Sequence, residues 1–234
     1  MNSKYGIDIW SDGNFFIEDG VAKINHDCKP SIISIVKKIR KQGFKGPLLL
    51  RFPHITKKQI KTLYTTFNSS IKEYDYKGKF NAVFPLKVNQ LPNFVHPLTS
   101  AGKKYNYGLE AGSKAELIIA MTYNNLGSPI TINGFKDKEM IHLCFIAKSM
   151  GHNITIIIEG LNELEMIIEV LNESKLESPN IGLRVRLHSG GSGLWAKSGG
   201  INSKFGLTST EILEAYELME ENNLVDYLTM IHFH

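Results

Sequence analysis

The stretch NAVFPLKVNQ, residues 81–90, combines an apolar, strand-like run with a lysine near its end. Lysine is among the residues least often buried, so Lys87 needs a reason to stand there. One interpretation is that its stem packs while its ammonium reaches solvent. The other is a reactive amine, which desolvation in the mouth of a barrel activates for attack on an aldehyde. The stretch alone leaves both interpretations open.

On both sides of this stretch, short β-branched runs alternate with longer helical patterns. This alternation predicts parallel strands joined by right-handed helical crossovers. The predicted strands are 48–52, 81–88, 106–112, 129–135, 154–160, 181–187 and 227–234, and the predicted helices are 32–42, 57–72, 113–125, 136–150, 162–173 and 209–223. Capping boxes are expected at Thr56 with Gln59, at Ser113 with Glu116, and at Thr208 with Glu211.

Two α/β architectures fit this pattern, an open doubly wound sheet and a (β/α)8 TIM barrel. The open sheet with a dinucleotide would place G-x-G-x-x-G after an early strand, and no such motif stands there. In a barrel, functional residues lie at the carboxyl ends of many strands. The sequence therefore favours the barrel, because polar residues fall late in most predicted strands: Lys87, Glu110, Asn133, Glu159, Arg184, Arg186, His232 and His234.

The first 45 residues or so differ from the rest. The segment IWSDGNFFIEDGVAKI, residues 9–24, has two Asp-Gly pairs between apolar runs, which predicts a hairpin outside the barrel. We expect residues 1–45 to form a β element and a lead-in helix, the β element belonging to a second β domain. Residues 46–234 then form a partial barrel.

Composition limits the function classes. Apolar residues make up 42% of the chain, and the net charge of +4 is spread out, which argues against nucleic-acid binding. Cys28 and Cys144 form no cysteine framework, so a reduced, cytoplasmic setting fits. The first residues do not resemble a signal peptide. No apolar run approaches the roughly 20 residues of a membrane helix, so no membrane partner is expected.

The predicted barrel strands carry several candidate site residues. His232 and His234 share a face of the last strand, which suits a zinc pair, an imidazole against a cofactor ring, or two core histidines. Glu110 and Glu159 end their strands, where a carboxylate could hold a substrate amine or orient a lysine. Each could equally be an ordinary polar residue at a junction.

A Gly/Ser-rich loop follows Arg184 and Arg186, and it contains no phosphate-binding P-loop motif. Long loops of this kind are often functional. We expect Trp195 and Phe205 within it to pack against other parts of the protein.

Taken together in chain order, these blocks resemble a known family. They are YGIDIW, LLLRFPHIT, FPLKVNQ, YGLEAGSKAEL, ITINGFKD, GLRVRL, SGGINSKFGL and the terminal IHFH. The chain resembles the biosynthetic arginine decarboxylases, pyridoxal-phosphate enzymes of the ornithine decarboxylase and alanine racemase barrel class. The likeness covers nearly the whole chain, and the block around Lys87 is the most diagnostic.

The resemblance implies roles for individual residues. Lys87 would form the Schiff base with pyridoxal 5′-phosphate, and His234 would stack on the pyridine ring. Glu110 would lie near that lysine and the ring, and Arg184 near the cofactor. The segment 204–206 would approach a dimer interface. Lys87 and His234 are thus the implied catalytic residues, and Lys87, Glu110, Arg184 and His234 the implied cofactor-binding residues.

The family likeness also implies an activity, decarboxylation of L-arginine to agmatine and CO2 in polyamine (spermidine and putrescine) biosynthesis. The partners would be a small amino-acid substrate and further copies of the chain, as a homodimer or higher oligomer. Magnesium is a family expectation, although no spacing in the sequence defines a metal site.

The sequence departs from the family by ending at His234, within a strand. Two barrel strands, the phosphate-binding glycine loop and a C-terminal β domain are expected to be absent, so we interpret the chain as a fragment that is inactive alone. Two alternatives stay open. One is a metal-dependent barrel hydrolase using His232 and His234, and the other is a non-catalytic barrel relative with a regulatory role.

Overall fold

The computed structural model describes residues 4–187 and 205–234. The chain divides into two compact units, Met1–Thr56 and Lys57–His234. The domain boundary expected near residue 45 stays a prediction. In the described part of the chain, no helix combines the length and apolar character of a membrane span.

The first unit is built around a β-hairpin. Strands β1 (Phe15–Glu18) and β2 (Val21–Ile24) pair antiparallel and form a sheet of their own. Between them, Asp19 and Gly20 have φ angles of 52° and 74°, the left-handed backbone that a tight hairpin turn requires. The predicted hairpin is confirmed. The same unit contains a 3-10 turn (Lys4–Gly6), helix α1 (Ile7–Trp10) and helix α2 (Ile32–Lys41).

Residues 48–52 do not form the predicted strand. The backbone there is irregular, and helix α3 (Pro53–Glu73) begins directly after it. Proline suits the first turn of a helix, because its missing N–H would be unpaired there in any case. The helix therefore starts before Thr56, and the capping box expected at that residue is wrong.

The second unit contains six parallel strands in the order β3-β4-β5-β6-β7-β8. Each strand lies beside the next strand in the sequence, so the connections never reverse direction as they do in a doubly wound sheet. The partial (β/α)8 arrangement is confirmed, with six of its strands present. The strands are β3 (Val83–Pro85), β4 (Gly108–Ala111), β5 (Pro129–Ile132), β6 (Asn153–Ile158), β7 (Asn180–Arg184) and β8 (Leu228–His232).

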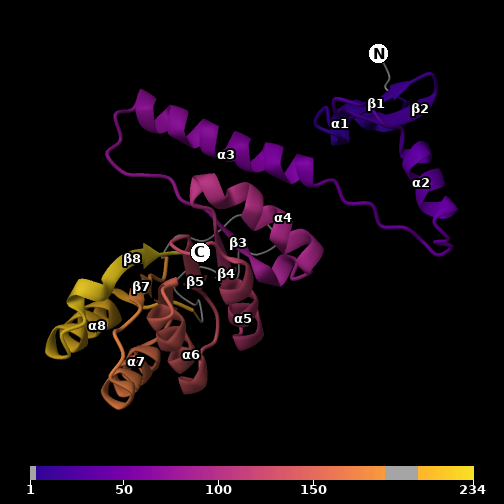
Figure 1. The fold of residues 1–234 in the computed structure, drawn as a ribbon. Helices are drawn as coiled ribbons and strands as arrows, with labels where there is room; N and C mark the ends of the chain where they lie inside the picture. The colour runs from indigo at the N-terminus through magenta and orange to yellow at the C-terminus, as the bar shows by residue number, and fades with distance from the viewer. Residues whose placement is uncertain (1–3, 188–204) are drawn as a thin grey trace. The chain divides into compact units, whose positions relative to one another are not determined.

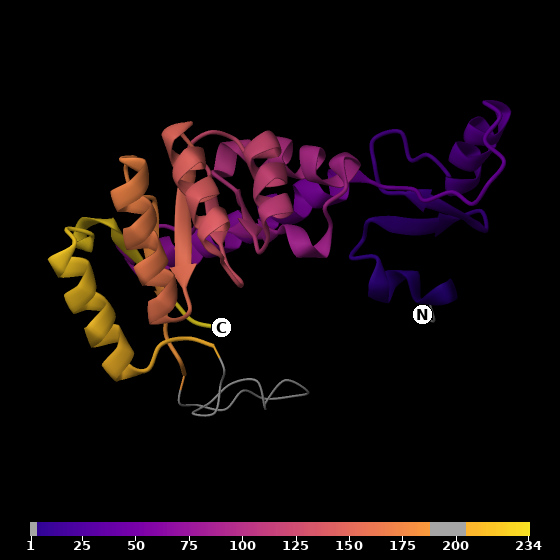
Figure 2. The ribbon, with the colours of Figure 1, turned by 90° about the horizontal axis from the view of Figure 1, so that it is seen from below.

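A helix connects each strand to the next. Figures 1 and 2 show α5 to α8 following one another along one side of the sheet. The connecting helices are α4 (Pro92–Gly102), α5 (Lys114–Tyr123), α6 (Lys138–Ser149), α7 (Leu161–Ser174) and α8 (Ser209–Glu221). Short 3-10 turns lie at Leu86–Val88, Lys103–Tyr105 and Val225–Tyr227.

Alternate residues of each strand face opposite sides of the sheet. The side toward the helices is apolar and closed: Leu109, Ile130, Ile132, Ile154, Ile156 and Ile181 are fully buried there. The inner side is more polar. A row of cross-strand partners runs across it, consisting of Pro85, Glu110, Thr131, Thr155 and Asn180.

Helix starts agree in part with the predicted capping boxes. Thr208 and Glu211 form the complete reciprocal box at the start of α8. At α5, Ser113 accepts from the Glu116 N–H, but the Glu116 carboxylate binds the Gly112 N–H instead of closing the box. The expectation at Ser113 is therefore correct for one of its two bonds.

Helix α4 was missed because it contains Pro97. An internal proline usually breaks a helix, since it removes one hydrogen bond and crowds the preceding turn. Here Val95 and Leu98 are buried against the sheet, so tertiary packing stabilises a helix that its sequence disfavours.

Candidate functional site

Polar side chains from all six strands gather at one edge of the sheet. Because parallel strands end at the same edge, residues at their carboxyl termini lie near one another. The prediction that these residues fall at strand ends is confirmed for most of them. In strand order, they are Lys87, Glu110, Asn133, Glu159, Arg184 and His232.

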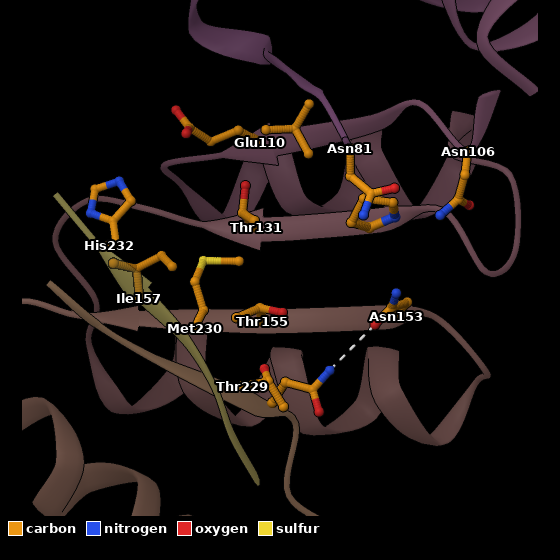
Figure 3. Close-up of a pocket in the computed structure, with 13 residues that line it drawn as sticks. Asn81, Asn106, Glu110, Thr131, Asn153, Thr155, Ile157, Thr229, Met230 and His232 are labelled. Carbon is orange, nitrogen blue, oxygen red and sulfur yellow. Dashed lines mark hydrogen bonds between the residues drawn. The ribbon is translucent and has the colours of Figure 1, made fainter. Parts of the chain in front are cut away.

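A cavity of about 460 Å³ lies against the inner side of the sheet. Figure 3 shows Glu110 and His232 at one end of this cavity and Asn81, Asn106 and Asn153 at the other. The first end corresponds to the carboxyl termini of the strands. The amide of Asn180 donates to Asn153 at 3.4 Å, at the opposite end.

Lys87 follows the first strand of the sheet rather than lying inside it. β3 ends at Pro85, and Lys87 is the middle residue of the 3-10 turn Leu86–Val88. Leu86 is fully buried and anchors the turn, whereas the Lys87 side chain is exposed. Lys87 therefore lies exposed in a turn after β3 and not within the strand as predicted, and its reactivity toward an aldehyde stays a prediction.

Glu110 lines the cavity from the carboxyl-terminal half of β4. Its carboxylate accepts a long hydrogen bond of 3.4 Å from the Asn133 amide, which follows β5. The other amide atom, Asn133 Oδ1, is buried without a hydrogen-bond partner in the described residues, as is Thr131 Oγ1 beside it. Both oxygens can therefore form hydrogen bonds with a group bound at this edge.

Arg184 is held by an ion pair. Its Nη1 lies 2.7 Å from Glu159 Oε1, and the two side chains are 15% and 13% exposed. The guanidinium also lies 5.3 Å from the centre of the Phe205 ring. Glu159 is therefore occupied with Arg184 rather than free to hold an amine or a lysine. Phe205 contacts Arg184 but stays 52% exposed, so the expectation that it packs against the protein is met only in part. Trp195 and Lys204 lie outside the described residues.

The His232 imidazole at this edge is electrostatically perturbed. Burial is the main reason that the pKa of the His232 imidazole lies below its ordinary value. The nearby Arg184 lowers the pKa further, and Glu110 partly opposes this effect. His232 Nδ1 is buried without a hydrogen-bond partner in the described part of the chain. The imidazole is therefore neutral at physiological pH, with a ring nitrogen available to a bound group.

His234 is exposed and follows β8 by two residues. It contributes to the lowering of the pKa of His232, so the two imidazoles interact. Nowhere in residues 4–187 and 205–234 do three or more His, Cys, Asp or Glu side chains form a group that could hold a metal ion.

The structure brings three of the four predicted site residues into one electrostatic neighbourhood. Glu110, Arg184 and His234 all act on His232. Lys87 shares the edge but contacts none of them through a hydrogen bond or ion pair among the described residues. Sequence reasoning missed Lys136 and Glu163, a buried ion pair at this edge. A lysine just before a helix looks like an ordinary surface residue, so the sequence carried no signal for it.

Comparison with known proteins identifies relatives of this arrangement. Residues 57–234 match the family model described as pyridoxal-dependent decarboxylase, pyridoxal binding domain. The biosynthetic arginine decarboxylase of Tolumonas auensis is 39% identical over 98% of this chain, and that of Bacteroides thetaiotaomicron 40% identical over 98%. The chain spans 37% of the length of each of these relatives.

A solved structure gives the same result. The biosynthetic arginine decarboxylase SpeA from Campylobacter jejuni superposes with a TM-score of 0.90 and 59% identity, covering all of this chain and 37% of that one. Diaminopimelate decarboxylase from M. jannaschii superposes with a TM-score of 0.68 at 24% identity, a likeness of fold alone.

Proposed function

The chain belongs to the pyridoxal-dependent decarboxylases, and we propose that it supplies the cofactor-holding edge of an enzyme that converts L-arginine to agmatine and CO2. The observation that carries this proposal is the lysine that follows β3 at the polar carboxyl edge of the sheet. The choice of arginine rests on the names of similar proteins at 37–59% identity, which are biosynthetic arginine decarboxylases.

The residues at this edge fit pyridoxal phosphate. Thr131 Oγ1, Asn133 Oδ1 and His232 Nδ1 are buried polar atoms without partners among the described residues, and such atoms are uncommon unless a ligand or water engages them. When bound, the cofactor supplies an electron sink for the charge that decarboxylation leaves on the α-carbon.

We assign a role to each predicted residue. Lys87 would hold the cofactor through Nζ, and its exposed position on a short turn leaves that amine accessible. Glu110 would accept a hydrogen bond from the cofactor or orient the Lys87 amine. Arg184 would place positive charge beside the cofactor, oriented by Glu159. His234 would lie against the ring, which requires its exposed side chain to turn toward the cavity.

The finer parts of this proposal concern the whole protein. We propose that it works in polyamine biosynthesis in the cytoplasm, as a homodimer or higher homo-oligomer. Magnesium remains an expectation from the family likeness. The match to the pyridoxal binding domain favours this function over a metal-dependent hydrolase using His232 and His234.

The test is to trace the cofactor to Lys87. The protein is incubated with pyridoxal phosphate, reduced with borohydride and digested, and the modified peptide is identified by mass spectrometry. We expect a pyridoxyl group on Lys87, and no visible absorbance band in Lys87→Ala. Lys114→Ala is the matched control, because Lys114 is a partly exposed lysine just after β4. It should retain the band.

Two outcomes count against the proposal. Labelling of scattered surface lysines with an unchanged band in Lys87→Ala would contradict the role of Lys87. In the whole protein, cofactor uptake at Lys87 without release of CO2 and agmatine from L-arginine would contradict the proposed reaction and support a non-catalytic relative.

A further inference from the structure

A buried ion pair lies behind the cofactor-holding edge. Lys136 follows β5, Glu163 is the third residue of α7, and their side chains are 1% and 7% exposed. Lys136 Nζ lies 3.1 Å from Glu163 Oε1 and also donates to the Gly134 carbonyl. A lysine this deeply buried is rare unless it is paired. Its charge is therefore fixed in place by these two partners.

Stability alone does not account for such a pair. Removing two charges from water costs several kcal/mol per ion, and apolar residues of similar volume often replace a buried pair at no loss of stability. Burial raises the pKa of the Glu163 carboxyl despite the nearby Lys136 ammonium, which is the mark of this desolvation cost. We therefore expect the pair to orient other groups.

The two oxygens of Glu163 join separate loops at the carboxyl edge of the sheet. Oε1 contacts Lys136 in the loop after β5, and Oε2 accepts from the Glu159 N–H, at 2.8 Å, in the loop after β6. The Glu159 side chain in turn accepts from Arg184 Nη1 at 2.7 Å. A continuous series of contacts thus leads from Lys136 to the guanidinium of Arg184.

Arg184 is the end of this series that faces the site. It is the cross-strand partner of His232 in the pairing of β7 with β8. A shift of the Glu159 backbone would move the carboxylate that orients Arg184, and with it the positive charge beside His232. Glu159 directly follows β6 and Arg184 ends the neighbouring β7, and a displacement of one is passed to the other because a closely packed interior does not deform freely.

The same arrangement occurs at α5, with a neutral partner. Glu116, the third residue of α5, accepts from the Gly112 N–H at 2.7 Å and from the Gln90 amide at 2.8 Å. It therefore joins the loop after β4 to the loop that follows Lys87. At α5, the neutral side chain of Gln90 is sufficient to join two loops. By analogy, the loops at α7 could be joined without the charge of Lys136.

We propose that Lys136 and Glu163 are positioning residues, which act through Glu159 to fix the orientation of Arg184 for pyridoxal phosphate. This inference rests on the proposed cofactor-binding function. It assigns neither residue a contact with cofactor or substrate.

The experiment compares cofactor affinity with stability. Lys136→Met and the double variant Lys136→Met/Glu163→Leu are titrated with pyridoxal phosphate, and urea unfolding is followed for each. We expect both to bind at least about tenfold more weakly than the unmodified protein. The double variant leaves no uncompensated charge but removes the acceptor of the Glu159 N–H, so its urea midpoint should lie between those of Lys136→Met and the unmodified protein.

Lys138→Met is the matched control. Lys138 also joins α6 to α7, through Glu169 and Glu173, but it is 43% exposed and lies on the outer surface. Its removal should leave the affinity for pyridoxal phosphate within about twofold, because exposed pairs contribute little.

A double-mutant cycle tests the route through Arg184. If Lys136 acts through Arg184, Lys136→Met should weaken cofactor binding much less in an Arg184→Met background than alone. A purely structural role would give additive effects, and additivity would overturn the inference. So would a double variant that folds and binds as tightly as Lys138→Met. Failure of the whole protein, without substitutions, to take up pyridoxal phosphate would overturn the proposed function itself, and this inference with it.

Discussion

The contribution of the Arg184–Glu159 ion pair to the free energy of unfolding can be tested directly. Arg184→Met keeps an unbranched apolar stem but removes the guanidinium. Glu159 then retains a carboxylate that is only 13% exposed and has lost its partner at 2.7 Å. Hydrogen bonds to charged groups contribute about 1.5–3 kcal/mol. The contact of the guanidinium with the Phe205 ring adds about 0.5–1 kcal/mol.

The expected loss in the free energy of unfolding is therefore about 2–4 kcal/mol. The assay is urea unfolding followed by far-UV circular dichroism, with an unchanged m value as the condition for comparing midpoints. Lys138→Met serves as the reference, because its ion pairs are largely exposed and should contribute about 0–1 kcal/mol.

The pair itself is isolated by adding Glu159→Gln, alone and with Arg184→Met. Residues in direct contact show coupling energies of about 0.5–3 kcal/mol in such cycles. If Arg184→Met is no more destabilising than Lys138→Met, or if the coupling to Glu159 is zero, the reasoning that Arg184 is fixed by Glu159 is refuted.

Two further predictions concern titratable groups. The pKa of His232 is lower in the folded protein than in the unfolded chain, so the unfolded chain takes up a proton on this imidazole at a higher pH. The stability that depends on neutral His232 is therefore full above pH 6.5 and falls as the pH drops below it. His232→Gln should lose less stability than the unmodified protein between pH 7.5 and 5.5, and an equal loss in both proteins would contradict this. Burial raises the pKa of the Cys144 thiol to about 12, so a thiol reagent at pH 8 should label the exposed Cys28 at once and Cys144 only after unfolding, which mass spectrometry can check.

The sequence predicted the repeating part of the fold well. Runs such as ITI and ITIII are long enough, and bounded clearly enough, to define strands, and β5 and β6 lie within a few residues of their expected positions. Leucine-rich residues 48–50 lacked β-branched side chains, and without a neighbouring strand to pair with they stayed irregular. The errors thus occurred where local pattern and tertiary environment disagree.

The candidate site was predictable only in part, for a different reason. Glu110 and Arg184 could be found because strand alternation fixes which side of a sheet a residue faces. The contacts that each of these side chains makes could not be predicted, because the partners come from separate strands and loops. Arg184 meets Glu159 from 25 residues away, and Lys136 meets Glu163 across two loops.

The two kinds of glutamate at this edge show what a local pattern can and cannot specify. Glu211 stands three residues after Thr208 and closes a reciprocal cap within its own helix, so the sequence suffices to identify it. Glu116 and Glu163 occupy the same third position of their helices, yet each carboxylate reaches back to the loop before the helix and sideways to the neighbouring loop. Glu211 binds the capping residue of its own helix, whereas Glu116 and Glu163 bind backbone N–H groups directly after the preceding strands. A glutamate at the third position of a helix in this fold is therefore a candidate for joining active-site loops, as well as for capping.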